Sequence, residues 1–300
     1  MTRILVTGAS GFLGQHVVTA LAGSGHDIVA LSRSGTPLPG AARTIACDLL
    51  DQDAMREALE KADAEILVHS AWETDPRARW HSLSNLDWMT ASVALARRFG
   101  ERGGKRFVFV GSCAEYDWNQ PLLCEDSTPL RPATLYGSAK AATGIALSGA
   151  ASALGISLVW ARVFFCYGPG EPAGRLVHDL VDGISAGRRV PCTDGLQERD
   201  FLHAADIGAA LGLLATGSFE GPVNIASGEG TAVKDLITEV AAAAGDPSLV
   251  DFGALARPAN DPARLVGEVS RLHALGFRRR FDLHDGVRDT VKAMLAKPAS

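Results

Sequence analysis

Tyr136 and Lys140 are two residues whose types and spacing suggest catalysis. They are four positions apart in a segment with a helical pattern, so both side chains should lie on one face of a helix. A tyrosine with its usual pKa of about 10 is a poor acid-base catalyst near neutral pH, and a neighbouring ammonium group lowers that pKa. The pair therefore predicts a tyrosine that exchanges a proton with a substrate.

Ser112 directly follows an apolar segment, Arg106–Gly111, that we predict to be a strand. Open parallel sheets bind ligands at the carboxyl ends of their strands, which is where this serine would lie. We expect its hydroxyl to hydrogen-bond a substrate oxygen beside Tyr136. The alternative is a strand-terminal serine that only caps a turn.

A glycine-rich turn lies near the start of the chain. It follows the apolar strand Ile4–Thr7 and opens a helix. Glycines in that setting let the backbone turn sharply and approach a pyrophosphate at the positive end of the helix, so the turn predicts a dinucleotide site. The alternative is a purely structural tight turn. The residues that we assign to cofactor binding here are Gly8, Ser10, Gly11, Phe12, Leu13 and Gly14.

Two later positions bear on which dinucleotide is bound. The end of the second strand carries Arg33 and no acid, and an arginine there suits the 2′-phosphate of NADP(H). We therefore expect NADP(H), with NAD(H) as the alternative if Arg33 is only a solvated loop cation. Asp48 and Leu49 follow the third strand, where the adenine should lie. Asp48 would accept from the adenine amino group, or else cap the helix that begins near Asp51.

The elements that position these residues alternate between strand and helix. Continuous apolar strands separated by helices predict a doubly wound parallel sheet, a Rossmann fold of the α/β class. The predicted strands are Ile4–Thr7, Ile28–Ser32, Thr44–Cys47, Glu65–His69, Arg106–Gly111 and Ser157–Arg162, and the predicted helices are 12–23, 51–61, 81–102 and 134–154.

The composition changes after residue 165, where glycine and proline break the pattern. A further strand, Pro222–Ala226, and a helix, Val233–Ala244, indicate that the chain returns once to the sheet. We predict a dinucleotide-binding domain from residues 1–165 with a return at about 200–228. Residues 166–199 and 229–300 would form a smaller substrate-binding lobe.

The bulk properties exclude several classes of protein. The net charge is −5, no block of five or six like charges occurs, and no apolar run is long enough to span a membrane. The five cysteines form no C-x-x-C pair, which argues against a disulfide framework or a zinc site. We expect a cytoplasmic protein that binds no metal, nucleic acid or membrane.

Taken together, these motifs resemble the extended short-chain dehydrogenase/reductase family, which contains NAD(P)-dependent nucleotide-sugar epimerases, dehydratases and reductases. The resemblance covers nearly the whole chain and implies that Ser112 and Tyr136 bind the oxygen at the reacting carbon. It implies that Tyr136 passes the proton, that Lys140 holds the nicotinamide ribose and that Ala71 contacts the cofactor. The motifs that carry it are Thr7–Gly14, His69–Ala71, Gly111–Tyr116, Tyr136–Lys140, Tyr167–Gly170 and Arg199–His203.

Departures from the family pattern narrow the chemistry. Dehydratases of this family carry an Asp-Glu pair immediately after the catalytic serine or threonine, where this chain has Cys113 and Ala114. Glu115 is one position too far along to replace that pair. Members that epimerise carbons next to a keto group use a cysteine at the position of Ala114 and a histidine where we align Arg175, with His178 nearby. We therefore expect neither chemistry.

The remaining chemistry is hydride and proton transfer alone. Arg33 favours a reductase, and Gly111–Tyr116 followed by Asp117 and Trp118 resembles reductases of nucleotide-bound 4-keto-6-deoxyhexoses. We expect an NADP(H)-dependent reductase of such a sugar. The enzymatic alternative is an NAD(P)-dependent nucleotide-sugar 4-epimerase. A non-catalytic NADP(H)-binding regulator is the alternative of another class, and the joint presence of the catalytic residues argues against it.

The resemblance also implies a substrate side. Arg199 and Arg257 match family positions that hold a nucleotide diphosphate, with Arg175 as a third candidate, and surface ion pairing is the alternative role. Phe165 replaces a usual asparagine and Trp72 a usual small residue, so both should reshape the sugar pocket, although Trp72 would also suit a core. The resemblance further suggests a homodimer through the helices at 81–102 and 134–154.

Overall fold

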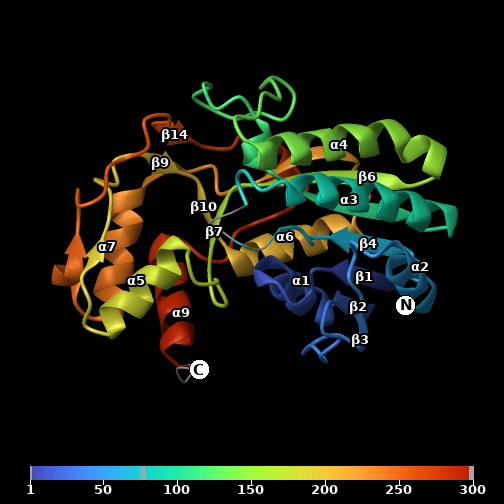
Figure 1. Cartoon of the computed structure of the whole chain (residues 1–300), viewed down its shortest axis with the longest axis horizontal. Helices are drawn as coiled ribbons and strands as arrows, with labels where there is room; N and C mark the ends of the chain where they lie inside the picture. The colour runs from blue at the N-terminus through green and yellow to red at the C-terminus, as the bar shows by residue number, and fades with distance from the viewer. Residues whose placement is uncertain (1, 74, 76–78, 297–300) are drawn as a thin grey trace.

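A parallel sheet forms the centre of the larger lobe (Figure 1). In the computed structural model, which describes residues 2–73, 75 and 79–296, this sheet has seven strands in the order β11-β6-β5-β4-β1-β2-β3. Its strands are β1 (Arg3–Thr7), β2 (Asp27–Ser32), β3 (Arg43–Ala46), β4 (Ile66–His69), β5 (Arg106–Ser112), β6 (Ser157–Val163) and β11 (Gly221–Ile225).

Helices cover both faces of the sheet because both faces of its strands are apolar. In β1, Ile4 and Val6 pack on one side with α1 (Phe12–Ala22) and α6 (Ala204–Thr216). Leu5 points to the other side, as the period of a strand requires, and joins a second core with three further helices. These are α2 (Gln52–Ala62), α3 (Ser84–Glu101) and α4 (Leu135–Leu154).

The strand order reverses beside β1, which pairs with β2 on one side and with β4 on the other. At such a switch point the two connections leave the sheet in opposite directions and open a crevice at the carboxyl ends of the strands. Thr7 is paired with His69 in this register, so the glycine turn after β1 lies beside the chain that leaves β4. The topology therefore places a ligand crevice at the glycine turn.

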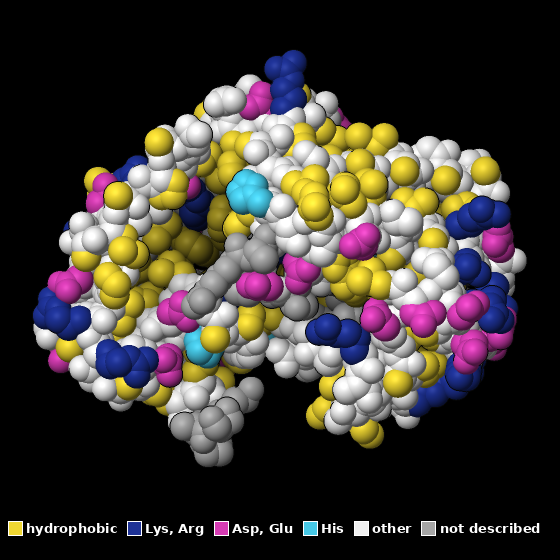
Figure 2. All heavy atoms as spheres, in the orientation of Figure 1, with side chains coloured by type: hydrophobic (Ala, Val, Ile, Leu, Met, Phe, Trp, Pro, Cys, Tyr) yellow, Lys and Arg dark blue, Asp and Glu magenta, His cyan; other side chains and the backbone are white. Residues whose placement is uncertain are grey.

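A smaller lobe lies beside this edge of the sheet, at the left of Figure 1. Its own apolar core is formed mainly by α5 (Leu176–Ser185), α7 (Val233–Ala244) and α9 (Leu283–Leu295). Figure 2 shows that the molecule is hollowed between the two lobes and that hydrophobic atoms line the hollow. The short elements are β7 (Phe165–Tyr167), β8 (Val190–Pro191), β9 (Glu198–Arg199), β10 (Phe201–His203), β12 (Thr231–Ala232), β13 (Val250–Asp251), β14 (Arg264–Leu265), α8 (Ser270–Ala274) and the 3₁₀ turns η1 (Cys113–Glu115) and η2 (Pro247–Leu249).

The predicted Rossmann fold is confirmed, and each predicted strand and helix has an observed counterpart whose ends differ by a few residues at most. The helix expected at 81–102 begins only at Ser84. α6 has no counterpart among the helices predicted from the sequence; it is rich in alanine and glycine and is buried against α1. Gly208 of α6 permits that contact, since a side chain there would meet the backbone of His16. None of the described helices combines the length and hydropathy that a membrane span needs.

His69 at the end of β4 should make the fold sensitive to acid. Ser92 donates its hydroxyl hydrogen to the Trp88 carbonyl, so it accepts from His69 Nε2, and Thr7 then donates to Nδ1. The ring is fully buried and neutral, and burial lowers its pKa to about 3. Below a pH of about 6.5 the His69 imidazole binds a proton in the unfolded chain but not in the folded chain. The free energy of unfolding therefore decreases as the pH falls.

We expect this histidine to remove about 2 kcal/mol of stability between pH 7 and pH 5. Urea unfolding at both pH values measures the loss, which should be smaller by that amount in His69→Gln. The exposed His273 serves as the control, and His273→Gln should lose as much as the wild type. An unchanged acid loss in His69→Gln would contradict the prediction.

Candidate active site

The turn after β5 places Ser112 at the carboxyl edge of the sheet. The Ser112 backbone N–H donates to Glu115 Oε1 at 2.7 Å, and the Ser112 hydroxyl accepts from the Ala114 N–H at 3.2 Å. Ser112 therefore does cap the short turn η1, which was the alternative to a catalytic role. Burial raises the pKa of the Tyr136 phenol and the Ser112 hydroxyl opposes that rise, so the capping serine also acts on the predicted catalytic tyrosine.

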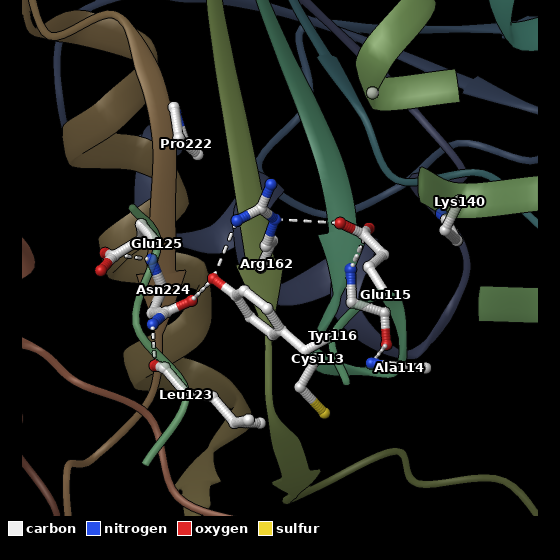
Figure 3. A network of polar contacts seen from close by, with 12 residues as sticks. Cys113, Ala114, Glu115, Tyr116, Leu123, Glu125, Lys140, Arg162, Pro222 and Asn224 are labelled. Carbon is white, nitrogen blue, oxygen red and sulfur yellow. Dashed lines mark hydrogen bonds and ion pairs between the residues drawn. The ribbon is translucent and has the colours of Figure 1, made fainter. Parts of the chain in front are cut away.

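Glu115 belongs to a buried polar network rather than to the substrate side (Figure 3). Its Oε2 accepts from Arg162 Nε at 3.0 Å, and neither side chain has more than 3% of its surface exposed. Arg162 also donates to the Tyr116 hydroxyl at 2.8 Å, which in turn donates to Asn224. The network thus links the Ser112 turn to β6 and β11.

Gly111 makes room for this network. Gly111 is paired with Arg162 in the register of β5 with β6. A Cβ atom at residue 111 would lie 2.5 Å from the Glu115 carboxylate and 2.6 Å from the Trp160 indole nitrogen. Burial raises the pKa of the Glu115 carboxyl, and the Arg162 guanidinium opposes that rise. The glycine before Ser112 therefore leaves room for the Glu115–Arg162 ion pair, and Glu115 of that pair binds the Ser112 N–H.

Tyr136 and Lys140 lie in the first two turns of α4, which begins after the N-cap Thr134. The Lys140 ammonium donates to the Val110 carbonyl at 2.7 Å and lies 3.8 Å from the centre of the Trp72 ring. Burial lowers the pKa of Lys140. Trp72 donates from its ring nitrogen to Asn85 Oδ1 at 2.8 Å, so it is a buried platform beneath the ammonium group.

Lys140 was expected to lower the pKa of Tyr136, but in the structure another cation has the larger effect on that pKa. Burial raises the pKa of the Tyr136 phenol, and the cation that most opposes this rise is Arg79, not Lys140. The Arg79 guanidinium carbon lies 5.5 Å from the centre of the Tyr136 ring. The hydroxyl of Ser112 is the second opposing group. The spacing correctly predicted a shared helix face but not which cation would act on the phenol.

The glycine turn fits a dinucleotide pyrophosphate. Gly8 has a φ of +64°, and a Cβ there would lie 2.7 Å from the Ala71 backbone nitrogen. A side chain at residue 14 would overlap the Gly8 carbonyl. The first turn of α1 carries no side-chain cap and no acidic residue, so its N–H groups remain available to an anion. Ser10 at the turn is exposed, whereas Phe12 and Leu13 are half-buried.

We expect Gly14→Ala to weaken NADPH binding at least about tenfold, which is about 1.4 kcal/mol. The added methyl group must displace the Gly8 carbonyl and with it the turn that approaches the pyrophosphate. Fluorescence titration with NADPH measures the change. Gly23 follows the end of α1 and has open space around it, so Gly23→Ala is the matched control and should bind as the wild type does. Equal affinities in both variants would contradict the prediction.

The positions assigned to the far end of the cofactor lie beside this turn at the ends of β2 and β3. Arg33 follows β2 and is exposed, and no described residue accepts a hydrogen bond from its side chain or pairs with it. Asp48 is exposed and accepts from the Leu50 N–H at 3.0 Å, while Leu49 is buried. The helix cap is Asp51, which accepts from two N–H groups of α2, so the alternative role for Asp48 is wrong.

The predicted substrate arginines fall into two places. Arg199 is buried, lies 5.5 Å from the Phe165 ring centre and forms an ion pair with Asp261. Arg257 pairs with Asp194 at 2.6 Å, and its charge helps to lower the pKa of Arg199, so these two cations are neighbours. Both therefore also make the ion pairs that were their alternative role.

Arg175 lies elsewhere. It pairs with Glu171 at 2.9 Å, donates to the Cys166 carbonyl, and its guanidinium carbon is 5.2 Å from the Phe12 ring centre. This places the side chain against the glycine turn of the cofactor site. We retain it as a candidate on the cofactor side of the crevice.

Several residues around Tyr136 were not found from the sequence. Trp80 meets the Tyr136 ring edge-on with centres 5.5 Å apart, and Trp118 meets Trp80. The Asn85 amide ties the Arg79 carbonyl to the Trp72 ring. No motif marks Arg79, Trp80 or Asn85, whereas Trp118 and Trp72 had been noted in the sequence for other reasons. Nowhere in residues 2–73, 75 and 79–296 do three His, Cys, Asp or Glu side chains gather as a metal site requires.

Comparisons with known proteins agree with this geometry. The profile of the NAD dependent epimerase/dehydratase family matches residues 4–226. A UDP-glucose 4-epimerase of Corynebacterium glutamicum is 26% identical, with 88% of this chain and 86% of that protein aligned. A dTDP-4-dehydro-6-deoxy-D-allose reductase of a Streptomyces species is 27% identical, with 99% of this chain and 94% of that protein aligned.

Solved structures show the same architecture. The UDP-glucose 4-epimerase of Thermus thermophilus in complex with NAD superposes with a TM-score of 0.88 at 24% identity, covering 98% of this chain and 99% of that one. MoeE5 in complex with UDP-glucuronic acid and NAD superposes with a TM-score of 0.84 at 30% identity, covering 97% and 98%. The chain therefore belongs to the NAD-dependent epimerase/dehydratase family of extended short-chain dehydrogenases/reductases and is an NAD(P)-dependent enzyme.

Proposed function

We propose that the protein is an NADP(H)-dependent reductase of a nucleotide-activated 4-keto-6-deoxysugar. The observation that carries this proposal is the Ser112 hydroxyl acting on the buried Tyr136 phenol at the crevice, with Cys113 and Ala114 in place of the acid and base that elimination needs. Such a site can bind a carbonyl oxygen and pass one proton. The relatives named as 4-dehydro-6-deoxysugar reductases support the substrate class.

The residues of the chain divide the reduction between them. Bound NADPH would supply the hydride. Ser112 donates a hydrogen bond to the carbonyl oxygen of the substrate, and Tyr136 gives its proton to that oxygen as negative charge develops on it. Lys140 and Ala71 hold the cofactor beside Tyr136, and the glycine turn binds the pyrophosphate. Phe165, Arg199 and Arg257 line the substrate side.

The stoichiometry of NADPH consumption to product formation tests the proposal. A panel of nucleotide 4-keto-6-deoxysugars is incubated with the enzyme and NADPH, and NADPH absorbance and product are measured together. Consumption of one NADPH for each product supports the reductase. Product formed without net loss of reduced cofactor supports the second candidate, a nucleotide-sugar 4-epimerase, which is favoured by the relatives of that name and by the NAD in the similar structures.

Arg33 is the basis for the NADP(H) preference. Its exposed guanidinium follows β2, and the last residues of that strand carry no carboxylate that would bind a ribose 2′-hydroxyl. We expect Arg33→Ala to weaken NADPH binding about tenfold and to leave NADH binding unchanged, because only NADPH carries the 2′-phosphate. Parallel titrations with the two cofactors measure this difference. Equal losses for both would contradict an NADP(H) preference.

The domain division and the assembly complete the proposal. We infer a dinucleotide-binding domain of 1–165 with a return at 200–228, since β11 joins the sheet, and a substrate lobe of 166–199 and 229–300, which has its own core. Hydrophobic side chains are exposed over α3 and α4 (Figure 2), which supports a homodimer through those helices. The five unpaired cysteines of the described chain suit the reducing cytoplasm. Sedimentation velocity tests the dimer.

A further inference from the structure

We propose that Arg79 is a positioning residue that acts through Tyr136, with its guanidinium stabilising the ionised phenol oxygen as the proton is passed. The proposal rests on the proposed function only in taking Tyr136 as the proton carrier. It adds a second cation to a site in which spacing alone pointed to Lys140.

The segment that carries Arg79 is hydrogen-bonded to the first turn of α4. The Arg79 guanidinium carbon lies 5.5 Å from the Tyr136 ring centre and 5.3 Å from that of Trp80. The Tyr136 backbone N–H donates to the Trp80 carbonyl at 3.2 Å, and the two rings meet edge-on. A cation at this distance favours the ionised form of a phenol. The contact between guanidinium and tyrosine is thus fixed by the backbone as well as by the rings.

A buried amide holds the backbone of Arg79. Asn85 has none of its surface exposed and donates from Nδ2 to the Arg79 carbonyl at 2.7 Å. Its Oδ1 accepts from the Trp72 ring, on which the Lys140 ammonium lies. One side chain therefore supports both the Arg79 segment and the Trp72 ring on which the Lys140 ammonium lies.

Among the residues that the structure describes, none forms an ion pair with the Arg79 guanidinium. Its Nε is buried without a hydrogen-bond partner, and no carboxylate of the described chain lies within ion-pair distance of the guanidinium. By contrast, the Lys140 ammonium donates to the Val110 carbonyl. An uncompensated cation in a partly dry site acts strongly on its neighbours. Its charge opposes the rise in the pKa of the Tyr136 phenol and also lowers the pKa of Lys140.

The other groups that face Tyr136 come from three elements. Arg79 precedes α3, Lys140 lies on α4 itself, and β5 with its following turn contributes Ser112, Cys113 and Glu115. Glu115 and Cys113 raise the pKa of the phenol, as burial does, while Arg79 and Ser112 lower it. Removing Arg79 would leave the Ser112 hydroxyl as the main group that opposes the effect of burial on the phenol pKa.

The small number of tyrosines makes the ionisation measurable without any substrate. The chain contains three, and burial raises the pKa of Tyr116 and Tyr167 above the ordinary value. Protein labelled with 3-fluorotyrosine gives three fluorine resonances, and Tyr136→Phe identifies the one from Tyr136. Fluorination also lowers phenol pKa values, which brings the titration toward the pH range in which the protein is folded. The pH midpoint of this resonance is the quantity to compare.

We expect the Tyr136 midpoint to rise by about 1 pH unit in Arg79→Gln and to stay near the wild-type value in Arg79→Lys, which keeps the charge. Arg131→Gln is the matched control, because it removes the same charge from an exposed side chain on the segment before α4. The control should leave the midpoint unchanged. A midpoint in Arg79→Gln equal to that of the wild type, or an equal rise in Arg131→Gln, would overturn the proposal.

Turnover gives an independent readout. The alkaline limb of kcat/KM should move to higher pH in Arg79→Gln by the same amount as the fluorine midpoint, and Arg79→Lys should restore it. An equal loss of rate at every pH with an unmoved limb would show a merely structural role and would overturn the proposal. If no keto-sugar is turned over, the proposed function fails, yet the fluorine titration still decides whether Arg79 acts on Tyr136.

Discussion

Replacing Tyr136 with phenylalanine is expected to lower kcat by about 10²–10⁴-fold while the Kd for NADPH stays within about twofold. The ring remains and keeps its edge-on contacts with Trp80 and Trp72, whose centres lie 5.5 and 6.5 Å away. Only the hydroxyl that is proposed to pass the proton is lost. Steady-state kinetics and fluorescence titration with NADPH measure the two effects separately.

Tyr167→Phe provides the matched control for this substitution. Tyr167 lies in β7, and its hydroxyl is 3.5 Å from the Asp282 carbonyl, away from the Ser112 turn. Removing that hydroxyl should change kcat by no more than about twofold, because it takes no part in proton transfer. Turnover in Tyr136→Phe above about a tenth of the wild-type rate would show that another group carries the proton.

Replacing Glu115 with leucine is expected to reduce the free energy of unfolding by about 3–5 kcal/mol. The change leaves the Arg162 guanidinium without its counter-ion in a site where the arginine has only 3% of its side chain exposed. The Ser112 N–H also loses its acceptor. Since the lost charge lies behind the serine turn, kcat should fall as well, and urea unfolding measures the stability loss.

The double variant Glu115→Leu with Arg162→Met distinguishes the stability lost through an unpaired charge from the stability lost through altered packing. Removing both charges should recover more than half of the loss, because apolar groups of similar volume often replace a buried ion pair without penalty. The exposed pair Arg97–Glu101 is the control, and Glu101→Leu should cost no more than about 0.5 kcal/mol. A loss below about 1 kcal/mol in Glu115→Leu would contradict the prediction.

At this site, features that depend on residues close together in the sequence were predicted, whereas contacts between distant segments were not. The glycine turn, the helix face shared by Tyr136 and Lys140 and the strand-end position of Ser112 depend on neighbours within a few residues. Strand and helix periods therefore predicted them with nearly correct bounds. The doubly wound parallel sheet also followed, because alternating strands and helices of this length admit few arrangements, whereas the order of the strands came from the structure.

The alternation of strands and helices and the spacing of the tyrosine, lysine, serine and glycine motifs thus by themselves predicted the fold, the family and the place of the candidate site. Only the tertiary structure decided which charges act there. Arg79 approaches Tyr136 because Asn85 and the Trp80 carbonyl hold a loop against α4, and Glu115 meets Arg162 because the β5–β6 register brings Gly111 opposite Arg162. Electrostatic effects depend on burial and on distances between segments that are far apart in sequence, and no local period encodes either.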